Sequence, residues 1–151
     1  MAGIKPPREK PMPATFESFG IKFLYPDNWK TVAREEDEGS DGVTFELPSG
    51  GFFTLECERE GQLAEEIVEA VADSISEEYE EVEQEQVRLE GAADDERCVD
   101  FRFYYLDLLV ISRLIIMPID DTTLVIQMQA ESRDFDENEL VFSAILQQIR
   151  K

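Results

Sequence analysis

Short runs of alternating apolar and polar residues recur along the chain, a pattern typical of strands with one buried face. Gly50 and Gly51 separate two such runs and can adopt the positive φ of a tight connection, which predicts a hairpin there. The nearly continuous apolar run Leu108–Met117 predicts a central strand that is covered on both faces. The strands expected from these patterns are 21–25, 31–34, 43–47, 52–58, 82–89, 97–105, 108–117 and 123–130, with 82–89 a polar strand near an edge.

Two segments change to a repeat of about four residues and predict amphipathic helices at 62–79 and 135–149. Ser132 or Asp134 is the expected N-cap of the second helix. Hairpin-length connections between strands favour antiparallel pairing, and the two helices can cover the central strand from opposite sides. The sequence therefore predicts an α+β fold, an α/β/α sandwich with a mainly antiparallel sheet and one helix on each face.

The length of 151 residues indicates one domain. Four prolines among the first fifteen residues, with few large apolar side chains, predict a flexible N-terminal arm at 1–15 and a single domain at 16–151. The arm lacks the apolar core of a signal peptide, and no uncharged apolar run is long enough to span a membrane. A cytoplasmic protein without membrane contact is expected.

Acidic residues outnumber basic ones, 35 to 14, and the formal net charge is −21. Such a surface repels nucleic-acid phosphates and anionic lipid headgroups, so neither is an expected partner. It favours a basic protein partner, although an excess of acids is also common on surfaces that are simply solvated. The composition leaves the oligomeric state undetermined.

The chain contains no histidine, which excludes Ser-His-Asp and Cys-His catalysis and histidine zinc sites. Cys57 and Cys98 lack CxxC spacing and fall in predicted strands, where they are expected to be small core residues. The acidic segment Glu35–Gly42 lacks the ligand spacing of a calcium loop, and no glycine-rich phosphate loop is present. We therefore predict no catalytic residue, cofactor or metal, and expect a protein that is not an enzyme.

Arg113 interrupts the apolar central strand and needs a partner if it is buried. A hairpin closed at Leu106-Asp107 places Asp100 directly across from Arg113, because a slip of one residue would set core residues opposite charged ones. Arg102 and Tyr104 lie on the same strand face as Asp100. These four residues form the candidate binding face, with two interpretations: a structural ion pair or a functional groove.

The segment Phe19–Trp29 contains, from Gly20 onward, the pattern G-φ-x-φ-x-Y-P-x-x-W, and the last helix carries Phe142, Ile145 and Leu146. Together they resemble the start and the closing helix of PsbP-like and Mog-like domains. The resemblance implies an α/β/α sandwich over about residues 16–150. It also implies a mostly non-enzymatic role, since such domains include photosystem II extrinsic subunits, Ran-binding nuclear proteins and chaperones of secreted effectors. Tyr25 and Trp29 are expected to anchor one end of the core.

Two classes of function remain. The favoured one is a small protein-binding module, an adaptor or chaperone-like protein, that presents a sheet face or a helix edge to its partner. The alternative is a ligand-binding protein or enzyme that uses the polar face around Asp100, Arg102 and Arg113. A deep pocket that holds these side chains would favour the alternative, and a covered face would favour the binding module.

Overall fold

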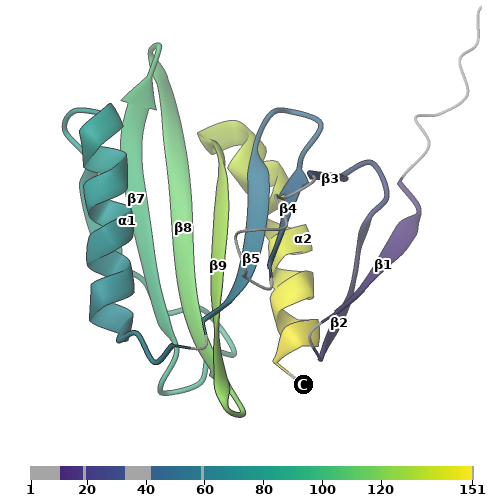
Figure 1. Cartoon of the computed structure of the whole chain (residues 1–151). Helices are drawn as coiled ribbons and strands as arrows, with labels where there is room; N and C mark the ends of the chain where they lie inside the picture. Colours follow the sequence, from purple (N-terminus) through teal and green to yellow (C-terminus); the bar gives the residue numbers. More distant parts are fainter. Residues whose placement is uncertain (1–10, 19, 33–41, 59, 151) are drawn as a thin grey trace, which may run out of the picture.

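The computed structural model describes residues 11–18, 20–32, 42–58 and 60–150 (Figure 1). Within these residues, one antiparallel sheet has seven strands in the order β3-β4-β5-β9-β8-β7-β6, and β1 and β2 form a separate two-stranded sheet. The elements in chain order are β1 (Pro13–Ser18), β2 (Ile21–Pro26), β3 (Lys30–Val32), β4 (Gly42–Glu46), β5 (Phe52–Glu58), α1 (Ala64–Glu78), β6 (Glu83–Gln86), β7 (Arg97–Tyr105), β8 (Leu108–Ile119), β9 (Thr122–Glu131) and α2 (Ser132–Ile149).

The large sheet carries one helix on each face, as the sequence predicts (Figure 1). The helix α1 packs over β7 and β8, while α2 packs over β8 and β9 on the opposite face, next to β2. Each interface excludes water from apolar side chains, which is the main source of stability in such a layered fold. On the α1 side the buried apolar residues are Ile67, Val68, Ile75, Val99, Phe101, Phe103, Leu114 and Ile116.

The central position of β8 confirms the interpretation of its apolar run. Leu114 and Ile116 pack toward α1, and Ile115 and Met117 belong to the core beneath α2. All four side chains are buried, so neither face of the strand can accept a charge without a partner. This requirement makes Arg113, in the same strand, the residue that needs an explanation.

The small β1–β2 sheet covers β4 and β5 beside α2 and closes one end of the core. Trp29, just after β2, is 4% exposed, and its ring lies 5.8 Å from that of Phe53 and 5.9 Å from that of Phe142. The Tyr25 ring lies 4.6 Å from the Phe45 ring. Tyr25 and Trp29 therefore have the anchoring position expected of them, because large rings in mutual contact fix the orientation of the segments that carry them.

Several predicted boundaries are corrected. β1 begins at Pro13, inside the predicted arm, and pairs with the whole of β2. Residues 1–10 of the arm and residues 35–41 of the acidic segment lie outside the described residues. β8 continues through Pro118 to Ile119, two residues past the predicted end of this strand at Met117. Pro118 is tolerated because β7 pairs with β8 only as far as Ile116 and leaves that edge without a partner strand in the described sheet.

Both helices begin at residues other than those predicted. The N-cap of α2 is Glu131, whose Oε2 accepts hydrogen bonds from the Arg133 backbone N–H (2.7 Å) and the Ser132 hydroxyl (2.9 Å). The prediction of Ser132 or Asp134 is wrong because β9 runs into α2 without a loop. The first helix begins at Ala64, two residues after the predicted start at residue 62, and Leu63 just before it is 62% exposed.

Candidate functional site

The β7–β8 hairpin has the predicted register. Phe103 lies opposite Val110, Phe101 opposite Ser112, and Asp100 directly opposite Arg113. The turn contains Leu106 and Asp107, which have φ values of 49° and 66°. Positive φ at both central residues is the geometry of a two-residue hairpin turn that matches the twist of its strands.

Asp100 and Arg113 form a bidentate ion pair beneath the N-terminal half of α2. The Arg113 Nε lies 2.8 Å from Asp100 Oδ1, and its second terminal nitrogen lies 3.0 Å from Oδ2. The Asp100 side chain is 3% exposed and that of Arg113 is 12% exposed. Burial lowers the pKa of Arg113, but the hydrogen bond and the negative charge of Asp100 outweigh it, so the pKa is raised and the guanidinium stays charged.

Two residues of α2 cover the outer side of this pair. The Phe135 ring centre lies 5.1 Å from the Arg113 guanidinium carbon, a cation–π distance. The Glu139 carboxylate lies 3.5 Å from the remaining terminal nitrogen of Arg113. The pair is thus enclosed by the sheet below and by an aromatic ring and a second acid above.

The other two predicted residues are arranged differently. Arg102 lies 2.9 Å from Glu85 of the edge strand β6 and 3.8 Å from Asp100, so it joins the polar network at its exposed side. Tyr104 is 66% exposed and belongs to the end of the hairpin. The expected face of four residues is therefore not one continuous groove, because β7 continues past the last residue that β6 pairs with, Arg102.

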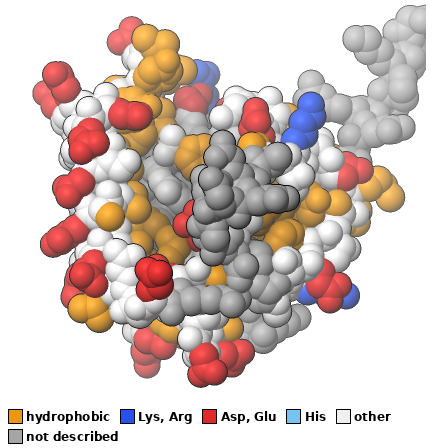
Figure 2. Space-filling model, viewed as in Figure 1, with side chains coloured by type: hydrophobic (Ala, Val, Ile, Leu, Met, Phe, Trp, Pro, Cys, Tyr) orange, Lys and Arg blue, Asp and Glu red, His pale blue; other side chains and the backbone are white. Residues whose placement is uncertain are grey.

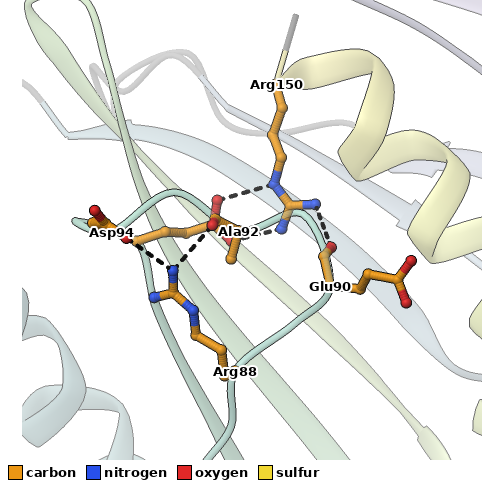
Figure 3. A network of polar contacts seen from close by, with 6 residues as sticks. Arg88, Glu90, Ala92, Asp94 and Arg150 are labelled. Atoms are coloured by element: carbon orange, nitrogen blue, oxygen red, sulfur yellow. Dashed lines mark hydrogen bonds and ion pairs between the residues drawn. The ribbon is translucent and has the colours of Figure 1, made fainter.

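A second buried ion pair lies on the same side of β7 and was not predicted (Figure 3). Arg150, just after α2, donates two hydrogen bonds to the Glu96 carboxylate at 3.0 and 2.6 Å and one to the Glu90 carbonyl at 3.4 Å. The Glu96 side chain is 1% exposed. By contrast, the neighbouring Arg88 makes its contacts at the surface, with the Ala92 carbonyl and with Asp94.

Cys98 lies between the two ion pairs along β7. It is 6% exposed, and burial raises the pKa of its thiol to about 12, against an ordinary value of 9.0, even though the nearby Arg113 acts in the opposite direction. A thiol with such a pKa stays protonated and unreactive at neutral pH. The position therefore fits the predicted role of Cys98 as a small core residue.

A pocket of about 270 Å³ lies between α2 and the segment that leads to β7. Arg113 and Arg150 both line it, together with Glu90, Glu139 and apolar residues of α2. Each guanidinium already donates two hydrogen bonds to a buried carboxylate. In the described residues, no three His, Cys, Asp or Glu side chains are grouped to hold a metal ion.

The end of the β7–β8 hairpin projects beyond the sheet and exposes a cluster of large apolar side chains (Figures 1 and 2). We call Tyr104, Tyr105, Leu106, Asp107 and Leu108 the hairpin tip. Its two tyrosines are 66% and 52% exposed, and its two leucines are 77% and 44% exposed. Of these residues only Tyr104 was among the predicted site residues, although four large apolar residues around one aspartate, Tyr104-Tyr105-Leu106-Asp107-Leu108, are a signal in the sequence.

A second apolar surface lies between α2 and the small sheet, in a groove of about 550 Å³. Leu140, on its rim, is 84% exposed, and Leu24 is 47% exposed. We call this hollow the α2–β2 groove. Its lining residues are Pro11, Pro13, Leu24, Tyr25, Pro26, Leu140, Val141, Ala144 and Gln148.

No protein-family profile and no curated protein sequence matches this chain. Solved structures do. Cyanobacterial PsbP from Synechocystis sp. PCC 6803 aligns with a TM-score of 0.60 at 12% identity, over 97% of this chain and 96% of that protein. PA94 from Pseudomonas aeruginosa, a protein of unknown function, aligns with a TM-score of 0.51 at 12% identity, over 89% of this chain and 94% of its own.

These likenesses establish a PsbP-like fold, as the Tyr25-Pro26 and Trp29 pattern indicated; neither of them supports the Mog-like part of the resemblance. At 12% identity they carry no information on activity or partners. Neither α1 nor α2, the helices of the described residues, combines the length and the apolar character needed to traverse a bilayer.

Proposed function

We propose that this protein is a non-enzymatic protein-binding module, of adaptor or chaperone-like type, that contacts its partner through the hairpin tip. The observation that carries this proposal is the exposure of Tyr104, Tyr105 and Leu106 at the end of a projecting hairpin. Tyrosine is enriched among the residues that dominate binding energy at protein interfaces. An exposed apolar cluster with a charged surround is typical of such a contact surface.

The backbone of the tip supports the same interpretation. Leu106 has a φ of 49°, a region that costs an ordinary L-residue about 1–2 kcal/mol and that asparagine or glycine occupies more easily. A leucine that is both strained and 77% exposed contributes little to the folded state of the isolated chain. Strain of this kind is concentrated at functional positions, where a partner can compensate for it.

The polar face gives less support to the alternative of a ligand-binding protein or enzyme. Both Asp100 oxygens accept hydrogen bonds from Arg113, and Asp100 is 2% exposed. Asp100 does not line the pocket of about 270 Å³ beside α2, and Arg113, which does, already donates two hydrogen bonds to Asp100, so a substrate there would have to compete with the ion pair. This arrangement favours a structural role for Asp100 and Arg113 and leaves the surface features to bind a partner.

The chemistry of the partner follows from charge. A net charge of −21 raises the association rate of a basic protein and opposes approach of nucleic acid. The favoured partner is therefore a protein with an apolar recess for the tip and basic residues around it. Asp107 is itself exposed and lies between the exposed Leu106 and Leu108, where its carboxylate can meet such a residue.

Affinity capture from the native organism with three bait proteins tests this proposal. The baits are the wild type, Leu106→Asp and the control Leu63→Asp, which makes the same change at another leucine that is mostly exposed. A partner retained by the wild type and by Leu63→Asp but lost from Leu106→Asp would support the proposal. Capture of the same proteins by all three baits would contradict it.

A further inference from the structure

The α2–β2 groove is unusual because it combines an exposed helix with an absence of charge. Residues 140–149 of α2 contain no Asp, Glu, Lys or Arg, although 32% of the chain is charged. Several of these residues are turned outward, including Leu140 and Ala144. A helix face that only contacts water would be expected to carry charged side chains, as the outer face of α1 does.

The groove has two firm walls. α2 supplies Leu140, Val141 and Ala144, and the small sheet supplies Leu24 and Pro26. The Leu24 backbone N–H donates a hydrogen bond of 2.9 Å to the Gln148 side chain, which fixes the strand against the helix. This contact also occupies the edge of β2 at Leu24, so a partner would dock by its side chains and not by adding a strand there.

Acidic residues stand at one end of the groove. Asp27 follows Pro26 directly, and Asp136 and Glu137 lie one helical turn before Leu140; all three are exposed. β2 runs from its contact with Gln148 toward the N-terminal half of α2, so these acids belong to the same end (Figure 1). The lining of the groove is therefore uncharged, and three exposed acids flank it near the Pro26 end without belonging to the lining.

We propose that the α2–β2 groove docks an amphipathic helical segment of a protein partner, with apolar anchors in the groove and basic residues at the Pro26 end. This inference rests on the proposed function as a binding module and adds a second surface with its own partner chemistry. A volume of about 550 Å³ accommodates a few large apolar side chains. A second copy of this chain fits less well, because two chains of charge −21 repel each other.

The first test uses a peptide of leucine and lysine only, with leucines at helical i, i+3, i+4 and i+7 spacing, and a counterpart in which every lysine is glutamate. We expect the Leu/Lys peptide to bind the wild type and Leu63→Asp with equal Kd. Leu140→Asp should weaken it at least about tenfold, because a charge replaces an apolar contact. The added negative charge would by itself attract the lysines of the peptide. If attraction between charges alone caused binding, Leu140→Asp would therefore lower the Kd instead of raising it.

Titrations repeated at about 0.5 M salt separate the apolar contact from the general attraction of a basic peptide to an acidic protein, since salt screens the latter. Equal binding by the wild type and Leu140→Asp would overturn the proposal. Equal binding of the Leu/Glu peptide would overturn its requirement for basic residues. Leu106→Asp should bind the Leu/Lys peptide like the wild type, because the hairpin tip is separate from the groove. If the peptide does not bind the groove, only the groove proposal is overturned, and the proposal for the hairpin tip stands.

A second test identifies the occupant directly. In the full chain, Leu140 is replaced by the photo-crosslinking residue p-benzoylphenylalanine and illuminated with the Leu/Lys peptide. A crosslink to the peptide, located by mass spectrometry, supports the proposal. A crosslink to a second copy of the chain, or to its own residues 1–10, would assign the groove to that occupant and overturn it.

Discussion

The Asp100 carboxylate lies directly across the β7–β8 hairpin from the Arg113 guanidinium, and two hydrogen bonds of 2.8 and 3.0 Å join them. This geometry neutralises the one cation of an otherwise apolar central strand. The cost of removing each charge from water is offset only while both partners are present. Replacing one member of the pair should therefore lower the free energy of unfolding more than replacing both members by apolar residues.

Asp100→Ala should lower the free energy of unfolding by about 3–5 kcal/mol, because it leaves the Arg113 charge buried without its main partner. Urea denaturation followed by circular dichroism measures this loss. The double change Asp100→Leu with Arg113→Met should recover most of it, since apolar residues of similar size can replace a buried pair. A loss below about 1 kcal/mol for Asp100→Ala would show that the pair is not buried in solution.

Glu96→Ala should lower the free energy of unfolding by about 2 kcal/mol, because it removes two charge-assisted hydrogen bonds to Arg150. Arg150 is 15% exposed and can partly turn to water, which limits the loss. The matched control is Asp94→Ala, which removes the partner of Arg88 at the surface and should leave the stability unchanged. Equal effects from both substitutions in parallel urea titrations would refute this distinction.

Cys98 should make stability sensitive to alkali. The folded thiol has its pKa raised to about 12 and stays protonated at pH 10, whereas an unfolded thiol of pKa 9.0 is mostly ionised. Ionisation of the unfolded thiol therefore lowers the free energy of unfolding by about 1.4 kcal/mol at pH 10 and by almost nothing at pH 8. Comparing the wild type with Cys98→Ala at both pH values isolates this effect from other titrating groups. An unchanged difference between the two proteins would contradict it.

Leu106→Asn should raise the free energy of unfolding by about 1 kcal/mol, since asparagine tolerates the positive φ of this turn better than leucine does. The same change at Leu108 should bring no gain, because Leu108 is not among the residues with positive φ. Denaturant midpoints of the two variants give the comparison. A gain in stability at Leu106 together with a loss of partner capture would be the signature of a residue kept for binding.

The register of the β7–β8 hairpin was predictable because burial constrains both strands at once. A slip of one residue would have placed Arg113 among the apolar residues facing α1, and the two-residue turn at Leu106-Asp107 sets the pairing among those that keep it on the other face. The two helices and the covered central strand were predictable for a similar reason, since their apolar spacing is long and regular. Features fixed by many side chains at once were therefore recovered.

Features fixed by one distant contact were not. Glu96 and Arg150 are far apart in sequence, and no periodic pattern links a residue before β7 with the end of the last helix. β1 was missed because the prolines at and before its first residue suggested an arm. Its order comes from pairing with β2 and from the contact of Phe16 with Phe23, whose ring centres lie 5.0 Å apart. Tyr104 was grouped with Asp100 because residues an even number of positions apart point to the same face of a strand. The alternation does not tell how deeply each side chain on that face is buried.

The position of β9 in the sheet bears on how the chain folds. In the described sheet, β5 reaches β8 only through β9, so the strands that precede α1 are joined to β8, β7 and β6 by the most C-terminal strand described. Thr54 and Gln127, which meet across β5 and β9, are 73 residues apart. Such non-local pairing slows folding, because the chain loses the conformational entropy of a long loop before the stabilising contacts form. Because β9 covers one edge of β5 and one edge of β8 at the same time, we expect misassembly to be most frequent in chains in which β9 is not yet paired.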